Sequence, residues 1–188
     1  KEQQKKSELL NTLPSTFSNV FVDTNGTAYS TCMGTGNDLL KKHSTDGTNM
    51  LGNVKTSSAL TDVTANKDGI IYASDSHGMI WVYTSQGEVI FQLGAEAADK
   101  DISGLFTSLT TIAVDNSGNI WTADGEKGYL QSFTPTEYAT TIFKALKEYE
   151  NGDYKEALRD WNYVLRLNQM SVLAHNGVAK AYYNDEVY

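Results

Sequence analysis

Cysteine, arginine and proline are scarce in this sequence of 188 residues, and the first two scarcities exclude particular kinds of protein. The single cysteine, Cys32, cannot form an internal disulfide framework or a zinc site of several cysteines. Arginine is rare, and the net charge of −8 argues against nucleic acid or an anionic membrane as the partner, because both would repel the chain. No apolar run approaches the roughly 18 residues that a membrane-spanning helix needs, so no membrane insertion is expected.

The rest of the composition is that of a globular chain, with 40% apolar and 20% charged residues. Its length suits one ordinary domain or two small ones. Abundant Thr, Ser, Asn and Gly beside few arginines is typical of exported bacterial proteins, extracytoplasmic or in the cell envelope, although it identifies no compartment. The chain begins with Lys1, and we expect it to be part of a longer protein.

A hairpin phrase occurs three times, as VDTNGTAY (22–29), TANKDGIIY (64–72) and AVDNSGNIW (113–121). In each phrase, an alternating apolar run precedes a turn of Asn, Asp and Gly, and a second β-rich run ends in an aromatic residue. The turn glycines, 43 and 49 residues apart, are Gly26, Gly69 and Gly118. Because further strand-like runs follow, the repeat predicts units of four short antiparallel strands in about 45 residues, the size of a β-propeller blade.

The periodicity changes after Pro135, where apolar residues begin to recur at helical spacing. Thr136 is a candidate N-cap, and the run Gly152-Asp153-Tyr154 predicts a turn between two helices. The run ALKEYENGDYKEALRDWNYVLRLN (145–168) resembles a tetratricopeptide repeat, and a second copy begins 34 residues later.

The run LTTIAVDNSGNIWTAD (109–124) resembles an NHL repeat, and residues 60–94 resemble a complete one. Together the resemblances imply a β plus α fold, with three four-stranded propeller-type blades followed by a tetratricopeptide helical hairpin. NHL propellers include protein binders, nucleic-acid binders and hydrolases related to gluconolactonases, so the resemblance does not select a function. The expected division is an N-terminal segment at 1–14, a partial NHL-type β-propeller at 15–135 with blades at about 15–52, 60–94 and 109–134, and a tetratricopeptide segment at 136–188.

Asp75 and Asp124 stand at equivalent places after the second strand of their hairpins, and His77 is close to Asp75. One interpretation makes these three residues metal candidates on the face of the propeller. The other makes the carboxylates turn caps that accept hydrogen bonds from loop amides, as a repeat would place in every unit. The alternative function is therefore a metal-dependent hydrolase similar to gluconolactonases, with a divalent metal such as calcium and with Asn66 and Asn116 as further ligands. Otherwise no cofactor is expected.

Asn176, Lys180 and Tyr183 are candidates for peptide binding on the concave face of an expected helix at 171–183. Asparagine and lysine in such a groove can clamp the backbone or the carboxylate of an extended peptide. Because no catalytic constellation is visible, the expected function is a non-catalytic protein-interaction or scaffold module with a protein or peptide partner. Three blades would leave two apolar faces open, which also allows a homo-oligomer that completes the propeller.

Overall fold

The computed structural model describes residues 16–33, 39–52, 54 and 59–185, so the predicted N-terminal segment at 1–14 lies outside the described residues. In this part of the chain, twelve strands precede three helices. The strands are β1 (Thr16–Val22), β2 (Ala28–Met33), β3 (Leu40–His43), β4 (Leu60–Ala65), β5 (Ile71–Asp75), β6 (Ile80–Tyr83), β7 (Val89–Leu93), β8 (Ala95–Glu96), β9 (Leu105–Phe106), β10 (Leu109–Val114), β11 (Ile120–Asp124) and β12 (Tyr129–Phe133). The helices are α2 (Glu137–Asn151), α3 (Tyr154–Leu167) and α4 (Val172–Asp185).

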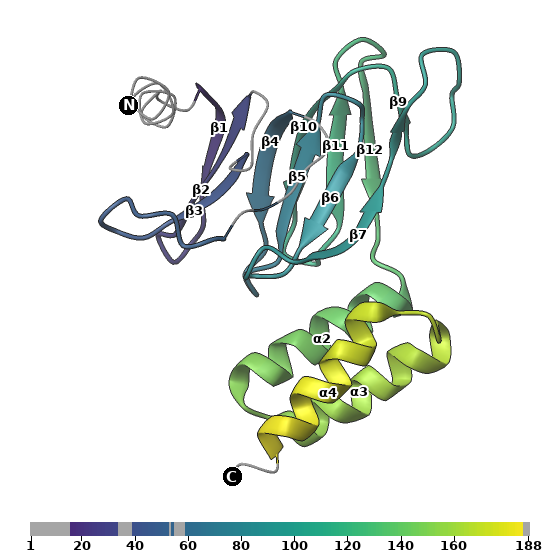
Figure 1. Cartoon of the computed structure of the whole chain (residues 1–188). Coiled ribbons are helices and arrows are strands. Elements are labelled where there is room, and N and C mark those ends of the chain that lie inside the picture. Colours follow the sequence, from purple (N-terminus) through teal and green to yellow (C-terminus); the bar gives the residue numbers. More distant parts are fainter. Residues whose placement is uncertain (1–15, 34–38, 53, 55–58, 186–188) are drawn as a thin grey trace, which may run out of the picture.

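Three antiparallel sheets stack in chain order, and the helices lie beneath them at one end of the strands (Figure 1). The first sheet is β1-β2-β3, the middle sheet β4-β5-β6-β7 and the last sheet β10-β11-β12, while β8 and β9 form a short parallel pair. Tyr29 and Leu40 of the first sheet pack with Leu60 and Ile71 of the middle sheet. A second core fills the space between the middle and last sheets and includes Tyr72, Ile80, Val82, Leu109, Ile112 and Ile120.

The three predicted hairpins are confirmed as the pairs β1–β2, β4–β5 and β10–β11. Each turn opens with an Asp or Asn whose Oδ1 accepts two backbone N–H groups, and the glycine that ends it has a φ between 79° and 84°. The acceptor residues, with their donors at 2.8 to 3.0 Å, are Asp23 with Asn25 and Thr27, Asn66 with Asp68 and Ile70, and Asp115 with Ser117 and Asn119.

The middle and last sheets are joined by the buried carboxylate of Asp62 on β4. Its Oδ2 accepts from the backbone N–H of Ile112 at 2.8 Å and from the Thr111 hydroxyl at 2.5 Å, both on β10. Its Oδ1 accepts from the backbone N–H of Val63 at 2.8 Å. The residue before Asp62 lies in a β-bulge, and equivalent register shifts occur in β1 and β10, so the bulges recur where neighbouring sheets meet.

The predicted fold class is wrong. The described residues form four separate open sheets, of which only β4–β7 has four strands, and they contain neither a closed propeller nor a tetratricopeptide-like helical hairpin. In the first unit, the Oδ1 of Asn49 accepts from the backbone N–H groups of Lys42 and Leu51, and the expected fourth strand is reduced to a single bridge between His43 and Asn49. In the last unit, Pro135 has no N–H for a fourth strand, and the chain turns into α2 instead. The broader expectation of a sheet-rich chain with helices at its end holds.

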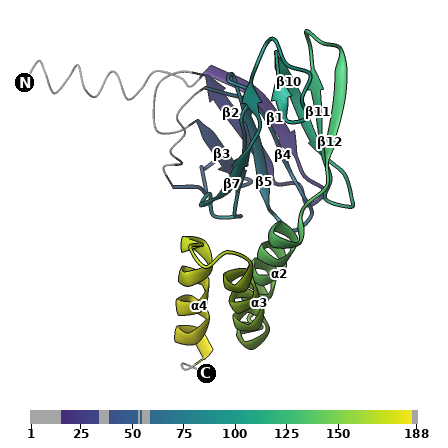
Figure 2. The same ribbon diagram turned by 90° about the vertical axis from the view of Figure 1, so that its right-hand side faces the viewer.

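Local signals define α2 well. Thr136 is its N-cap, accepting at Oγ1 from the backbone N–H of Ala139 at 3.3 Å, and Gly152 ends it with a φ of 87°. Three successive helices then pack side by side, as Figure 2 shows from a second direction. Phe143 of α2 packs against the core between the middle and last sheets, and its ring contacts Phe91 of β7. None of the described helices is long and apolar enough to cross a membrane.

Candidate functional site

Two of the three predicted peptide-binding residues line one groove, which we name the α4 groove. It has a volume of 170 Å³ and lies between the three helices and the turn that joins β6 to β7. Its apolar wall includes Leu146 and Leu173, while Asn176 and Lys180 of α4 supply an amide and an ammonium group. Tyr183 does not line the groove, and its side chain is 73% exposed.

The floor of the α4 groove contains a buried hydrogen-bond donor. Trp161 of α3 is 1% exposed, and its Nε1 has no hydrogen-bond partner among the described residues. The indole lies against Gly177, where any Cβ would clash with the ring, so glycine at this position allows α4 to approach α3 closely. A buried indole N–H usually has a partner, so this unsatisfied donor is an unusual feature of the groove.

The rim of the α4 groove carries opposite charges. Lys180 Nζ lies 3.7 Å from Oε1 of Glu88, and both side chains are more than half exposed. An exposed pair of this kind contributes about 0–1 kcal/mol, so a carboxylate on a partner can replace Glu88 at little cost. The Ser85 hydroxyl, which also lines the groove, donates to Glu150 of α2 and joins the helices to the sheet.

The metal candidates lie at the other end of the strands, and their carboxylates are engaged by the chain itself. Asp75 accepts at Oδ1 from the backbone N–H groups of His77 and Met79, at 2.8 and 3.0 Å, and at Oδ2 from Nε1 of Trp81 at 3.0 Å. Asp124 accepts four backbone N–H groups, from Thr107, Ser108, Glu126 and Lys127. These contacts have the geometry expected of turn caps.

The hydrogen bonds also determine the charge state of Asp124. Burial pushes the pKa of its carboxyl upward, but the backbone N–H groups of Lys127 and Thr107 outweigh it and hold that pKa below its usual value. His77 is exposed and meets Asp75 through its backbone rather than through its ring. Within the described ranges, no three His, Cys, Asp or Glu side chains are grouped closely enough to hold a metal ion.

Sequence reasoning missed two buried residues that matter most to the groove and the sheets. Neither Trp161 nor Asp62 was among the candidate site residues. The signal for Asp62 was its place among the apolar residues of a predicted strand, because a carboxylate is rarely buried without partners. Nothing local marked Trp161, because its free N–H depends on how α4 packs against it.

No protein-family model and no curated protein matches the chain, so its resemblance to NHL and tetratricopeptide repeats stays a prediction. Among solved structures, it is similar to the computationally designed Ika8 protein, with 13% identity and a TM-score of 0.46 over 63% of this chain. The match covers 33% of that protein, so the chain corresponds to about a third of its length.

Proposed function

We propose that this chain is a non-catalytic protein-interaction module that binds an extended peptide segment in the α4 groove. The observation that carries the proposal is the buried, unpartnered Nε1 of Trp161, which lies beside the apolar wall of the groove within the described residues. A peptide supplies the complementary groups: a backbone carbonyl for the indole N–H and an apolar side chain for the wall around Leu146 and Leu173. Lys180 at the rim favours an acidic residue next to that side chain.

The test is selection of random short peptides displayed on phage, with isothermal titration of the selected sequences. Binding should weaken by up to about fivefold in Lys180→Ala, since an exposed ion pair contributes about 0–1 kcal/mol. Tyr183→Ala is the matched control, because this side chain is on the same helix but outside the groove. If Lys180→Ala and Tyr183→Ala lose affinity equally, or if both variants bind the selected peptides as tightly as the parent chain does, the groove is not the binding site.

A contact between copies of this chain is a second candidate, favoured by the outer face of the first sheet. Val20 is 65% exposed and Val22 58%, whereas Val63 and Ala65, at the equivalent places in β4, are buried against the first sheet. We propose that a second copy covers this face with the outer face of its last sheet, where Trp121 is exposed. Light scattering should show a mass that rises with concentration and falls in Val20→Lys. A monomer at all concentrations contradicts it.

A further inference from the structure

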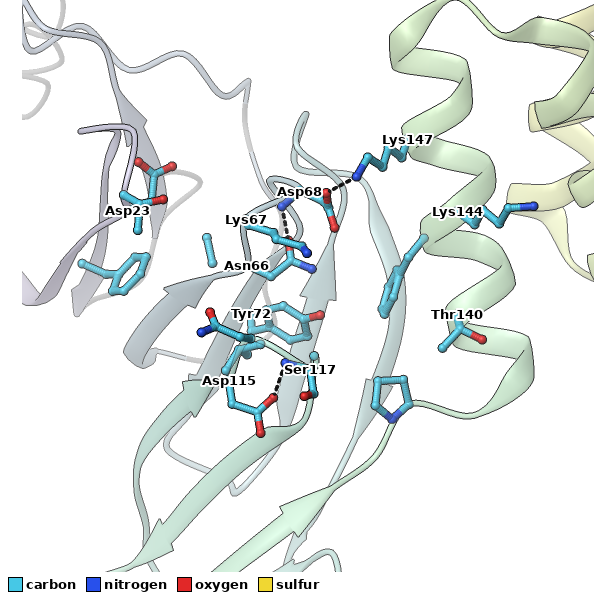
Figure 3. Close-up of a pocket in the computed structure, with 18 residues that line it drawn as sticks. Asp23, Asn66, Lys67, Asp68, Tyr72, Asp115, Ser117, Thr140, Lys144 and Lys147 are labelled. Carbon is cyan, nitrogen blue, oxygen red and sulfur yellow. Dashed lines mark hydrogen bonds and ion pairs between the residues drawn. The ribbon is translucent and has the colours of Figure 1, made fainter.

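The hollow at the helix end of the sheets differs from the α4 groove. This turn pocket has a volume of 480 Å³ and lies between the three hairpin turns and α2 (Figure 3). A more apolar hollow of 310 Å³ adjoins it, with Phe91, Ile120 and Phe133 in its wall. The two share Tyr72, Gly118, Pro135 and Phe143 in their walls, so a polar end and an apolar end of this region adjoin at these residues.

Tyr72 stands at the junction of the two ends. Its side chain is 1% exposed, and its hydroxyl has no hydrogen-bond partner among the described residues. Figure 3 shows the hydroxyl directed toward α2, across the pocket. Burial, together with the charge of Asp68, raises the pKa of this phenol, so it stays protonated and can only gain by donating to an acceptor.

The lysines of the pocket are not equivalent. Lys147 pairs with Asp68 at 2.7 Å, and Lys144 pairs with Asp160 at 2.6 Å and points away from the pocket in Figure 3. Lys67, at the tip of the middle turn, has no ion pair with any described residue. Its ammonium group extends into the space beside Tyr72 (Figure 3).

The acidic groups of the pocket have partners in the chain, because Asp68 pairs with Lys147 and the other two accept hydrogen bonds within their turns. The carboxylates of Asp23 and Asp115 each accept two backbone N–H groups, and hydrogen bonds from Asn119 and Trp121 lower the pKa of Asp115 to about 2. The free polar groups nearest the apolar end are therefore donors, from Tyr72 and Lys67. A ligand that complements them carries an anionic acceptor at one end and an apolar body at the other.

We propose that this space binds a small amphipathic carboxylate, with the carboxylate between Lys67 and the Tyr72 hydroxyl and an aromatic or aliphatic body between Phe91, Phe133 and Phe143. The same chemistry occurs in a free organic acid and in the C-terminal residue of a peptide. In both cases the ligand carboxylate accepts a charge-assisted hydrogen bond from the buried Tyr72 hydroxyl, which otherwise has no partner among the described residues.

The test is isothermal titration of the whole chain with phenylacetate and with phenylacetamide, which has the same body without the charge. Phenylacetate should bind roughly tenfold more tightly than the amide, since a hydrogen bond to a charged group is the difference between them. Tyr72→Phe and Lys67→Met should each reduce this preference several-fold. Tyr72→Phe removes only a hydroxyl that makes no bond to the described chain, so the variant should fold like the parent.

Lys144→Gln is the matched control, because Lys144 lines the pocket but pairs with Asp160, and it should leave the preference unchanged. N-acetyl-phenylalanine separates the two sources: tighter binding than phenylacetate identifies a peptide C-terminus, and weaker binding identifies a free acid. Equal binding of acid and amide, no binding of either, or an unchanged preference in Tyr72→Phe and Lys67→Met overturns the proposal. Failure here leaves the α4 groove untouched, because none of these substitutions changes a residue that lines it.

Discussion

Replacing Asp62 by alanine should destabilise the contact between the middle and last sheets more than any other single change to a polar residue of the sheets. Its carboxylate is 4% exposed and accepts three hydrogen bonds, from Val63, Ile112 and Thr111. Alanine would leave two buried backbone N–H groups without partners, at about 1–3 kcal/mol each, so we expect a loss of roughly 2–6 kcal/mol. The Thr111 hydroxyl, on an exposed residue, can bond to water and adds little.

The matched variants separate the carboxylate from its individual partners. Asp62→Asn keeps one acceptor oxygen and should lose about half as much stability as alanine. Thr111→Val removes only the hydroxyl and should cost about 1 kcal/mol or less. A double-mutant cycle between Asp62→Ala and Thr111→Val then gives the coupling across the two sheets.

Urea unfolding followed by fluorescence and by circular dichroism is the assay. Trp81 and Trp121 contribute fluorescence from the sheets and Trp161 from α3, while the helical circular dichroism reports on α2 to α4. The transition should move to a lower urea concentration with an unchanged slope. The substitution lowers the free energy of unfolding but does not change the surface area that unfolding exposes. A loss below about 0.5 kcal/mol for Asp62→Ala would refute the reasoning, since surface substitutions are within that range.

Three further substitutions test the packing and the charges. Gly177→Ala should cost about 1–3 kcal/mol through overpacking against Trp161, and a midpoint of thermal unfolding equal to the parent's would contradict that close approach. Burial and the charge of Asp160 raise the pKa of Glu148, so the ionised side chain lowers the stability of the fold as pH rises above about 4.3. Glu148→Gln should therefore stabilise the protein by about 0.5–2 kcal/mol at pH 7 but not at pH 3. Because the pKa of Asp124 is lowered, its ionised carboxylate stabilises the fold above about pH 3.9, and this contribution is lost in acid. Asp124→Asn should lower the stability at pH 7 and make stability less dependent on pH in acid. Parallel pH profiles of the parent and the variant would contradict this reasoning.

The elements that could be predicted from the sequence are those with causes a few residues away. Asp23, Asn66 and Asp115 cap their own turns, so the three hairpins follow from short segments. The cap at Thr136 and the stop at Gly152 likewise define α2 from its own ends. Asn176 and Lys180 were placed correctly on one helix because their spacing is helical.

The fourth strands could not be predicted in the same way. A strand needs a partner edge, and the β7 edge forms only where residues 89–93 meet β6 in register. In the first unit, the Asn49 side chain instead accepts hydrogen bonds from backbone N–H groups that a fourth strand would use. Composition and periodicity do not show this competition between a side chain and a strand. The four-strand repeat was therefore extended from the one unit that has it to two that do not.

The sequence by itself determined the hairpins, the helices and the acidic, cysteine-poor character of the chain, because these depend on neighbours along the backbone. Only the tertiary structure decided that Asp62 joins two sheets, that Trp161 faces a groove with its N–H free, and that Tyr72 stands between a polar and an apolar hollow. The burial and the missing partners of these groups are properties of several segments at once. No local pattern encodes them, since the free energy of a buried polar group depends on what the rest of the fold brings to it.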